Sequence, residues 1–270
     1  MFMKCVRWLM IVVLCTLSGC NLNRLKQAKE SLDSHDLAAA EKRYRAILES
    51  NPQEIEALAG LGWTYHLALK REDALSQFSY CLGIEPDNIE CIRGKSSVIL
   101  AQGDAKQARL WLDKALMIAP DDPDVLVSEA IWMLAQGEIS KASRQLEMVI
   151  RRVPENGGYR LPYAEALLRE SRSKEALEQT ELSLQSEIPR RTQAMVWILR
   201  ARALLAISSS AGEDCSQLSS INAWVSEAER ALNEAESTGV EVPNSAMINR
   251  QLGRRRTTLQ EKCPMGQGGG

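Results

Sequence analysis

The stretch from Glu54 to Asp87 decides the fold, and it reads EIEALAGLGWTYHLALKREDALSQFSYCLGIEPD. Its apolar residues recur in steps of three and four, at Leu58, Leu61, Tyr65, Ala74, Phe78 and Cys81. This spacing places apolar side chains on one face of a helix, so the stretch predicts two helices joined by a turn. Pro86 has no backbone N–H to offer and ends the second helix or lies just beyond it.

The same pattern repeats along the chain with a period of 34 residues. Alanines in register stand at Ala40, Ala74, Ala108, Ala142 and Ala176, and prolines in register stand at Pro52, Pro86, Pro120 and Pro154. A bulky residue follows four of the alanines, at Tyr44, Phe78, Leu112 and Leu146, while Gly103 and Gly137 occupy equivalent turns. Gly62 leaves room for a neighbouring helix to approach closely. Because one helix pair cannot bury its apolar face alone, we expect an all-α solenoid of stacked pairs.

These residues resemble the tetratricopeptide repeat family, over about five repeats between residues 21 and 189. The family's marks are clearest at Leu58, Leu61, Gly62, Tyr65, Ala74, Phe78 and Pro86. Two departures occur: Lys95 and Ser96 stand where Leu-Gly is expected in the third repeat, and Thr180 replaces the bulky residue in the fifth. The resemblance implies a right-handed superhelix whose concave wall, formed by the first helix of each pair, binds protein segments.

After Pro189 the period breaks but the helical pattern continues. We expect a degenerate sixth pair with a loop insertion over residues 190–243, with helices at 192–207 and 219–237. Residues 244–263 are predicted to hold a capping helix that is polar on one side. The glycine-rich tail 264–270 is predicted to remain unfolded.

The N-terminal residues 1–19 have the features of a lipoprotein signal peptide. Lys4 and Arg7 precede an apolar run over 8–17 that is much shorter than the roughly 20 residues a spanning helix needs. The run leads into Leu17-Ser18-Gly19-Cys20, which resembles the bacterial lipobox and predicts a lipid on Cys20; the alternative is a signal-peptide cysteine without an anchoring role. Asn21 then implies a lipid anchor in the outer membrane, facing the periplasm, although inner-membrane sorting stays open. The repeats would occupy residues 20–189.

The composition argues against several classes of function. The chain has 33 basic and 35 acidic residues, a net charge of −2, and no general positive field to hold a nucleic acid. Its only histidines, His35 and His66, are not spaced to share a metal ion, so we expect no metal or other cofactor. We find no phosphate-binding glycine loop, serine nucleophile elbow or paired-histidine zinc helix, which predicts a protein that is not an enzyme and has no small-molecule substrate.

Four cysteines follow Cys20 in the sequence: Cys81, Cys91, Cys215 and Cys263. In an oxidising compartment outside the cytoplasm, they can form disulfide bonds. They allow three pairings. The repeat arrangement favours Cys81 with Cys91, on adjacent helices, and Cys215 with Cys263 beyond the last helix. Alternatively, some of them are small buried hydrophobic residues, above all Cys81, which holds a packing position.

Counting equivalent faces of the first helices gives a mainly apolar predicted groove. It comprises Ala59, Trp63, His66, Leu67, Arg93, Ser97, Leu100, Val127, Ile131, Leu134, Leu161, Glu165 and Leu168. Such a strip suits a helix or an apolar peptide, and Ala59 and Trp63 replace the Lys and Asn with which some family members hold a terminal carboxylate. Two alternatives stay open: Trp63 packs against the preceding repeat, and part of the strip is buried by the curve of the solenoid.

The combination of lipobox and repeats resembles lipoproteins that assist pilus assembly or secretin multimerisation. It implies a non-catalytic, membrane-anchored scaffold for a cell-envelope machine such as a type IV or tight-adherence pilus or a secretion system. The alternative is an adaptor that regulates or targets a periplasmic peptidoglycan enzyme. Neighbouring genes for pilins and secretins, or for peptidoglycan enzymes, would distinguish the two.

Overall fold

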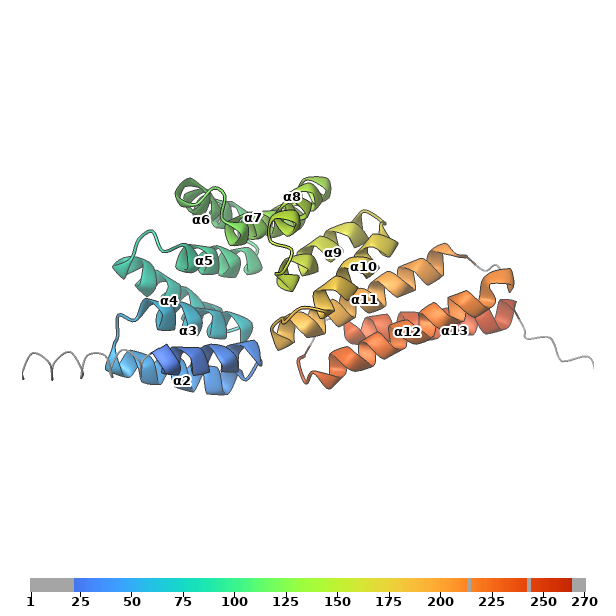
Figure 1. Ribbon diagram of the computed structural model, residues 1–270, viewed down its shortest axis with the longest axis horizontal. Helices are drawn as coiled ribbons and strands as arrows, with labels where there is room; N and C mark the ends of the chain where they lie inside the picture. Colours follow the sequence, from blue (N-terminus) through green and yellow to red (C-terminus); the bar gives the residue numbers. More distant parts are fainter. Residues whose placement is uncertain (1–21, 213–214, 242–243, 264–270) are drawn as a thin grey trace, which may run out of the picture. The chain divides into compact units, whose positions relative to one another are not determined.

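The computed structural model describes residues 22–212, 215–241 and 244–263, and these residues form helices and connecting turns without a strand. Residues 22–33 form the first described helix. The others, in chain order, are α2 (Leu37–Ser50), α3 (Ile55–Leu67), α4 (Arg71–Ile84), α5 (Ile89–Ala101), α6 (Ala105–Ile118), α7 (Pro123–Ala135), α8 (Ile139–Arg152), η1 (Gly157–Tyr159), α9 (Arg160–Arg169), α10 (Ser173–Leu184), α11 (Arg190–Ser210), η2 (Cys215–Gln217), α12 (Leu218–Ser237) and α13 (Ser245–Lys262) (Figure 1).

The chain divides into two compact units between Val125 and Leu126, within α7. In the first unit α2 packs on α3, α3 on α4, α4 on α5 and α5 on α6. In the second unit α8 packs on α9, and the series continues through α10, α11 and α12 to α13 (Figure 1). Since successive helices lie side by side in chain order within each unit, the predicted all-α solenoid of stacked helix pairs is confirmed.

The period of 34 residues marks the interior of the molecule. The five alanines in register, Ala40, Ala74, Ala108, Ala142 and Ala176, are all fully buried. Phe78 is also fully buried, and its ring lies against two glycines. A Cβ atom added to Gly62 would lie 2.7 Å from the Phe78 ring, and one added to Gly94 would lie 2.3 Å from it. The close approach expected at Gly62 is therefore present, and Gly94 on the next hairpin provides a second one.

The two departures from the repeat pattern are accommodated by polar contacts. The buried Ser96 hydroxyl donates a hydrogen bond to the Ala108 carbonyl oxygen at 2.9 Å. The Lys95 ammonium lies 4.3 Å from the centroid of the Trp111 ring, a favourable cation–π contact. The buried Thr180 hydroxyl donates to the Leu177 carbonyl at 2.6 Å. Each polar group thus has a partner that offsets the cost of its burial.

The turns inside the hairpins share a left-handed residue at every repeat. These residues, spaced by 34, have φ values of 61° at His35, 60° at Leu69, 91° at Gly103, 79° at Gly137 and 62° at Ser171. At the second turn the Leu69 N–H bonds to the His66 carbonyl and the Lys70 N–H to the Tyr65 carbonyl, which satisfies the end of α3. Only two of the five turns use glycine, the residue without steric cost there.

Leu69→Gly is therefore expected to raise the free energy of unfolding by about 0.5–1 kcal/mol. The left-handed backbone costs a non-glycine residue roughly 1–2 kcal/mol, and the greater freedom of glycine in the unfolded chain offsets part of that gain. Leu69 is 72% exposed, so little packing is lost. The matched Gly103→Ala should be destabilising, because no atom lies within 4 Å of its added Cβ and only the backbone term changes. Urea unfolding followed by circular dichroism measures both; equal midpoints for the two variants would contradict the prediction.

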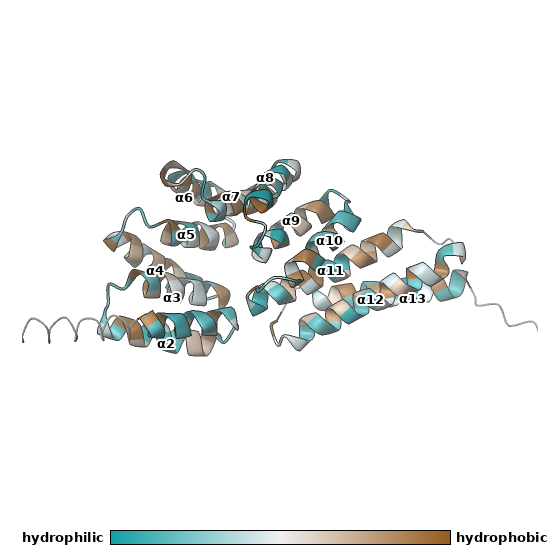
Figure 2. Ribbon diagram, viewed as in Figure 1, coloured by the Kyte–Doolittle hydropathy of each residue, from teal (hydrophilic) through white to brown (hydrophobic). Residues whose placement is uncertain are grey.

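The C-terminal helices follow the expected order, with one difference. Helix α11 continues to Ser210, past the predicted end at Ile207, and the hydroxyls of Ser208 and Ser210 donate to carbonyls three residues earlier. Helix α12 buries Ala228, and α13 buries Leu252 and Leu259. Figure 2 shows hydrophilic residues on much of the visible surface of α13. The predicted signal peptide and glycine-rich tail lie outside the described residues.

Candidate functional site

An open groove of about 650 Å³ lies in the first unit, on the side of the first helix of each hairpin. The helix of residues 22–33 forms one wall, α3 forms the other, and the start of α5 closes one end. We call it the N-terminal groove. It is lined by Leu22, Leu25, Lys26, Lys29, Leu32, Tyr44, Ile55, Glu56, Ala59, Gly60, Trp63, Asn88 and Glu90.

Small residues form part of this surface. Ala59 is 6% exposed, and Gly60 lies so close to Tyr44 that an added Cβ would stand 2.3 Å from the phenol ring. Burial, together with the charges of Asp33 and Glu56, raises the pKa of Tyr44 to about 12. The Tyr44 phenol is therefore neutral at ordinary pH and presents an aromatic surface rather than a charge.

The rim of the N-terminal groove carries charges of opposite sign on its two sides. Lys26 and Lys29 project from the helix of residues 22–33, with side chains 73% and 70% exposed. Across the groove are the exposed Glu56 on α3 and Glu90 on α5. The apolar interior therefore lies between a basic side and an acidic side.

Trp63 connects the groove to the core and to the next hairpin. Its indole N–H donates to the Glu90 carboxylate at 2.6 Å. Its ring lies edge to face against Phe78, with centroids 5.5 Å apart, and against His66, with centroids 5.7 Å apart. Trp63 therefore packs against Phe78 of its own hairpin, is bonded to the next hairpin through Glu90, and also lines the groove.

The polar contacts continue from α3 to α5 and α7 within the first unit. His66 Nε2 lies 3.4 Å from the Ser97 hydroxyl. Arg93 pairs with Glu90 at 2.7 Å and with Asp124 at 3.5 Å. The structure thus brings Trp63, His66, Arg93 and Ser97 onto one side of the unit, where Leu67 and Leu100 are partly buried.

Comparison with known proteins assigns the repeat. Residues 25–88 match the tetratricopeptide repeat family, a range that includes α3 and most of the helix of residues 22–33. These residues form tetratricopeptide repeats. No curated protein sequence matches the chain significantly. The family match ends at residue 88, and the later hairpins continue the same stacked helical fold.

Solved tetratricopeptide structures have the same fold over most of the chain. TTC0263, a thermophilic protein of Thermus thermophilus, is 22% identical, with a TM-score of 0.59 over 69% of this chain and 98% of its own. PilF of Pseudomonas aeruginosa is 17% identical, with a TM-score of 0.52 over 90% of this chain and 96% of its own. PilW, a widely conserved type IV pilus biogenesis factor, is 16% identical, with a TM-score of 0.53 over 92% of this chain and 96% of its own.

Part of the predicted groove lies on α7 and α9 of the second unit. Val127 and Leu134 are 8% and 6% exposed and belong to the core around Leu146 and Leu167, in line with the alternative that part of the predicted strip is buried. Each lies on the side of α7 that packs against this core. Ile131 is 44% exposed, whereas Leu161 and Leu168 are partly buried. Glu165 is held by Arg169 and Arg202.

The residues of the first wall were not among those predicted to line the groove. Leu25, Lys29 and Leu32 precede Ala59, Trp63 and His66 by 34 residues, so they occupy the same positions one repeat earlier. Extending the period backward by one unit would have found them. Tyr44 and Gly60 could not be found this way, because both belong to the close contact between neighbouring helices.

The cysteines are paired as Cys81–Cys91 and Cys215–Cys263, with Cα atoms 6.4 and 5.6 Å apart. The first bridge joins α4 to α5, and both of its cysteines are fully buried. The second joins η2 to the residue that follows α13, and Cys215 is exposed. The alternative that Cys81 is only a small buried hydrophobic residue is wrong, since it is both buried and bridged. The predicted lipidation site Cys20 lies outside the described residues.

The described residues hold neither a metal-binding cluster nor a helix suited to span a membrane. Within the described ranges, no group of His, Cys, Asp and Glu side chains is arranged to hold a metal ion. None of the described helices combines the length and the apolar character needed to cross a bilayer. We take the N-terminal groove as the candidate functional site because it is an open cavity with apolar walls and a charged rim.

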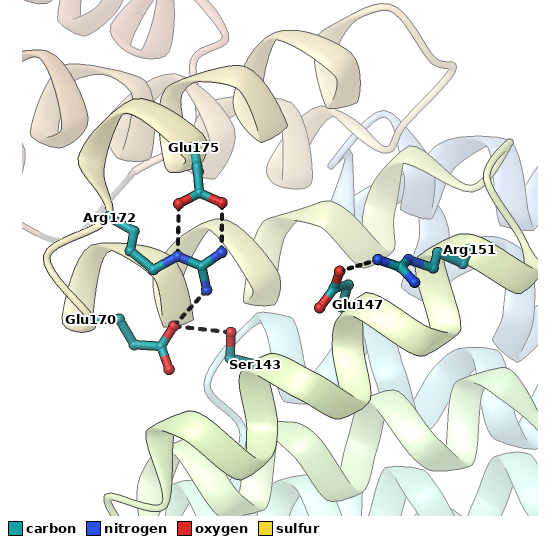
Figure 3. A network of polar contacts seen from close by, with 6 residues as sticks. All are labelled: Ser143, Glu147, Arg151, Glu170, Arg172 and Glu175. Carbon is teal, nitrogen blue, oxygen red and sulfur yellow. Dashed lines mark hydrogen bonds and ion pairs between the residues drawn. The ribbon is translucent and has the colours of Figure 1, made fainter.

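A charged network fastens the hairpin of α9 and α10 in the second unit. Figure 3 shows Arg172 between two carboxylates, with hydrogen bonds to Glu175 at 2.7 and 2.5 Å and to Glu170 at 3.0 Å. Glu170 also accepts a hydrogen bond from Ser143 of α8 at 3.1 Å. The hydrogen bonds from Arg172 lower the pKa of Glu175. At Glu170, burial raises the pKa, but hydrogen bonds from Arg172, Ser140 and Ser143 outweigh burial, so the pKa is lowered there too.

The stabilisation from this network should disappear in acid. A carboxylate with a lowered pKa stabilises the folded state above its ordinary value of 4.5, and this contribution is lost as the pH falls through the folded-state pKa. We expect Arg172→Met to lower the melting temperature at pH 7, by an amount that shrinks below pH 4.5. Arg151→Met, which removes one pair with Glu147 at 77% exposure of the arginine, is the control and should change little. If the melting temperature of Arg172→Met lay below that of the wild type by the same amount at every pH, this account would be contradicted.

Proposed function

We propose that the protein is a non-catalytic docking scaffold whose N-terminal groove holds a segment of another protein. Tetratricopeptide repeats are a protein-interaction fold, and stacked helical repeats present extended surfaces for binding. The observation that carries the proposal is the groove of about 650 Å³ inside residues 22–90, with apolar walls and a charged rim. Such a surface provides apolar contact area in its interior and charge selection at its edge.

We further propose that the scaffold is lipid-anchored through Cys20 in the outer membrane, faces the periplasm, and assists assembly of a pilus or secretion machine. The lipobox-like Leu17-Ser18-Gly19-Cys20 supports the anchor. The fold shared with PilF and with the pilus biogenesis factor PilW over 90% and 92% of the chain supports the type of machine. Neither likeness exceeds 17% identity, so the machine itself has to be tested genetically.

The docking function can be tested by site-specific photocrosslinking in living cells. A photoreactive amino acid replaces Leu22, which is 68% exposed and lines the groove, or Met148, which is 60% exposed on α8. We expect a crosslinked protein partner from position 22 and a much lower yield from position 148. No adduct at position 22, or equal yields at both positions, would refute docking in the groove.

Deleting the gene tests the type of machine and should reduce the number of pili or of secretin multimers. Unchanged assembly would refute the role in this machine.

The anchor has a test of its own. Cys20→Ser is expected to move the protein from the membrane fraction to the soluble fraction and to abolish labelling by a radioactive or clickable fatty acid. A thioether-linked lipid needs the sulfur atom, whereas Cys15→Ser in the same segment should leave fractionation and labelling unchanged. Continued fatty-acid labelling of the Cys20→Ser protein would contradict the anchor.

A further inference from the structure

We infer that the N-terminal groove takes an amphipathic helix of a partner protein, with acidic residues along one flank of its apolar face and basic residues along the other. This inference rests on the proposed docking function and names the chemistry of the partner. Three observations support it. The apolar residues on the two walls have helical spacing, the backbone groups of the walls and the Asn88 side chain already have hydrogen-bond partners, and the two sides of the rim carry opposite charges.

The two walls present apolar side chains at helical spacing. Leu22, Leu25 and Leu32 follow one another along the helix of residues 22–33 in steps of three and seven. On α3, Ile55, Ala59 and Trp63 follow in steps of four. The short side chain of Ala59 leaves room for a third helix, whereas the space beside Gly60 is filled by the Tyr44 ring. Helices in contact lie about 8–10 Å apart, and the anchors of a helix bound in a groove recur with the same steps of three, four and seven.

The groove offers little to the backbone of an extended peptide. An extended chain needs hydrogen-bond partners for its N–H and C=O groups, whereas a helix satisfies its own. Both walls are helices, whose interior backbone groups are already bonded within each helix. Asn88, the amide side chain that lines the groove, already accepts a bond from the Cys91 N–H at 3.0 Å and donates one to Glu85 at 3.0 Å. A helix therefore fits this surface better than a strand.

The rim gives the partner its charge pattern. Lys26 and Lys29 contact Glu30 and Asp33 at 4.0 and 3.5 Å through strongly exposed side chains. Exposed pairs of this kind contribute about 0–1 kcal/mol, so a carboxylate of the partner can replace them at low cost. On the opposite side, Glu56 is exposed and the Glu90 side chain is 47% exposed although it binds Arg93. A helix with one acidic and one basic flank is complementary to both sides at once.

Three synthetic helices of about 18 residues test this inference, each with the same leucine face and a fluorescent label; five turns of helix are enough to follow the groove. One has an acidic and a basic flank, one has two acidic flanks, and one has two basic flanks. Fluorescence anisotropy gives their affinities for the purified protein. We expect the wild type to bind the split-charge helix at least tenfold more tightly than either uniform helix. Binding of all helices should be lost in Leu22→Asp, a change at a site that is 68% exposed and tolerant in folding.

A charge reversal provides the decisive comparison. Lys26→Glu with Lys29→Glu makes both sides of the rim acidic, so the preference should change to the helix with two basic flanks. The matched reversal Lys141→Glu with Lys174→Glu, on α8 and α10, should keep the wild-type preference; circular dichroism checks that both variants fold. An unchanged preference after the rim reversal, or no preference in the wild type, would overturn the inference. If the charge preference fails in this way but position 22 still crosslinks a protein in cells, the charge pattern of the partner is rejected and the docking function stands.

Discussion

Phe78→Ala should lower the free energy of unfolding of the first unit by about 3–5 kcal/mol, which is the usual cost of emptying a buried phenylalanine site. The ring is fully buried and lies between Gly62 of its own hairpin and Gly94 of the next. Both glycines sit on rigid helices, so the cavity cannot close easily after truncation. Urea unfolding followed by circular dichroism, with hydrogen exchange to locate the change, gives the measurement.

The matched control for Phe78 is Tyr80→Ala on the same helix, α4. Tyr80 is 49% exposed, so its removal should cost much less than about 1 kcal/mol. The Phe78 variant should also weaken binding of the split-charge helix, because Trp63 loses the ring against which its edge is packed. Similar losses of stability in the two variants would show that the contact between Phe78 and its glycines does not hold the hairpins together.

Removal of the Cys215–Cys263 bridge by Cys215→Ser with Cys263→Ser should lower the free energy of unfolding by about 4 kcal/mol in the loop-entropy description. The bridge spans 48 residues and ties the end of α13 to η2, before the start of α12. The Cys81–Cys91 bridge spans 10 residues, so its removal should cost about 3 kcal/mol on the same scale. Thermal unfolding of the two double variants beside the wild type measures both effects.

Accessibility should separate the two bridges further. Cys215 is exposed, whereas Cys81 and Cys91 are fully buried. A mild thiol should therefore reduce the Cys215–Cys263 bridge in the folded protein and leave the other intact, as alkylation and mass spectrometry can show. After reduction α13 still has polar contacts, such as the Arg256–Glu229 pair at 2.7 Å. Unfolding of the Cys215/Cys263 double variant at the wild-type temperature would contradict the proposed role of this bridge.

The arrangement of the repeats could be predicted because the contacts that form a hairpin are local. Ala74, Phe78 and Gly62 lie within one period, and their spacing along the chain determines which helix faces can meet. Gly103 and Gly137 predicted two equivalent turns between helices, whereas the left-handed backbone that they share with His35, Leu69 and Ser171 is seen only in the structure. The expected helix ends at Ile207, whereas α11 continues to Ser210 with the Ser208 and Ser210 hydroxyls bonded to its own backbone.

The pattern of residues alone specifies the helical hairpins, their order, the buried alanines and the side of each hairpin expected to face a partner. Packing in three dimensions sets which part of that side is open: Val127 and Leu134 are covered by core side chains, while Leu22, Leu25 and Lys29 border a groove. Packing also sets the bond between Trp63 and Glu90, which are 27 residues apart, and the closeness of Gly94 to Phe78. The periodicity of the sequence specifies the direction in which a side chain leaves its own helix. Its exposure depends on the size of the side chains on the neighbouring helix and on how closely that helix approaches.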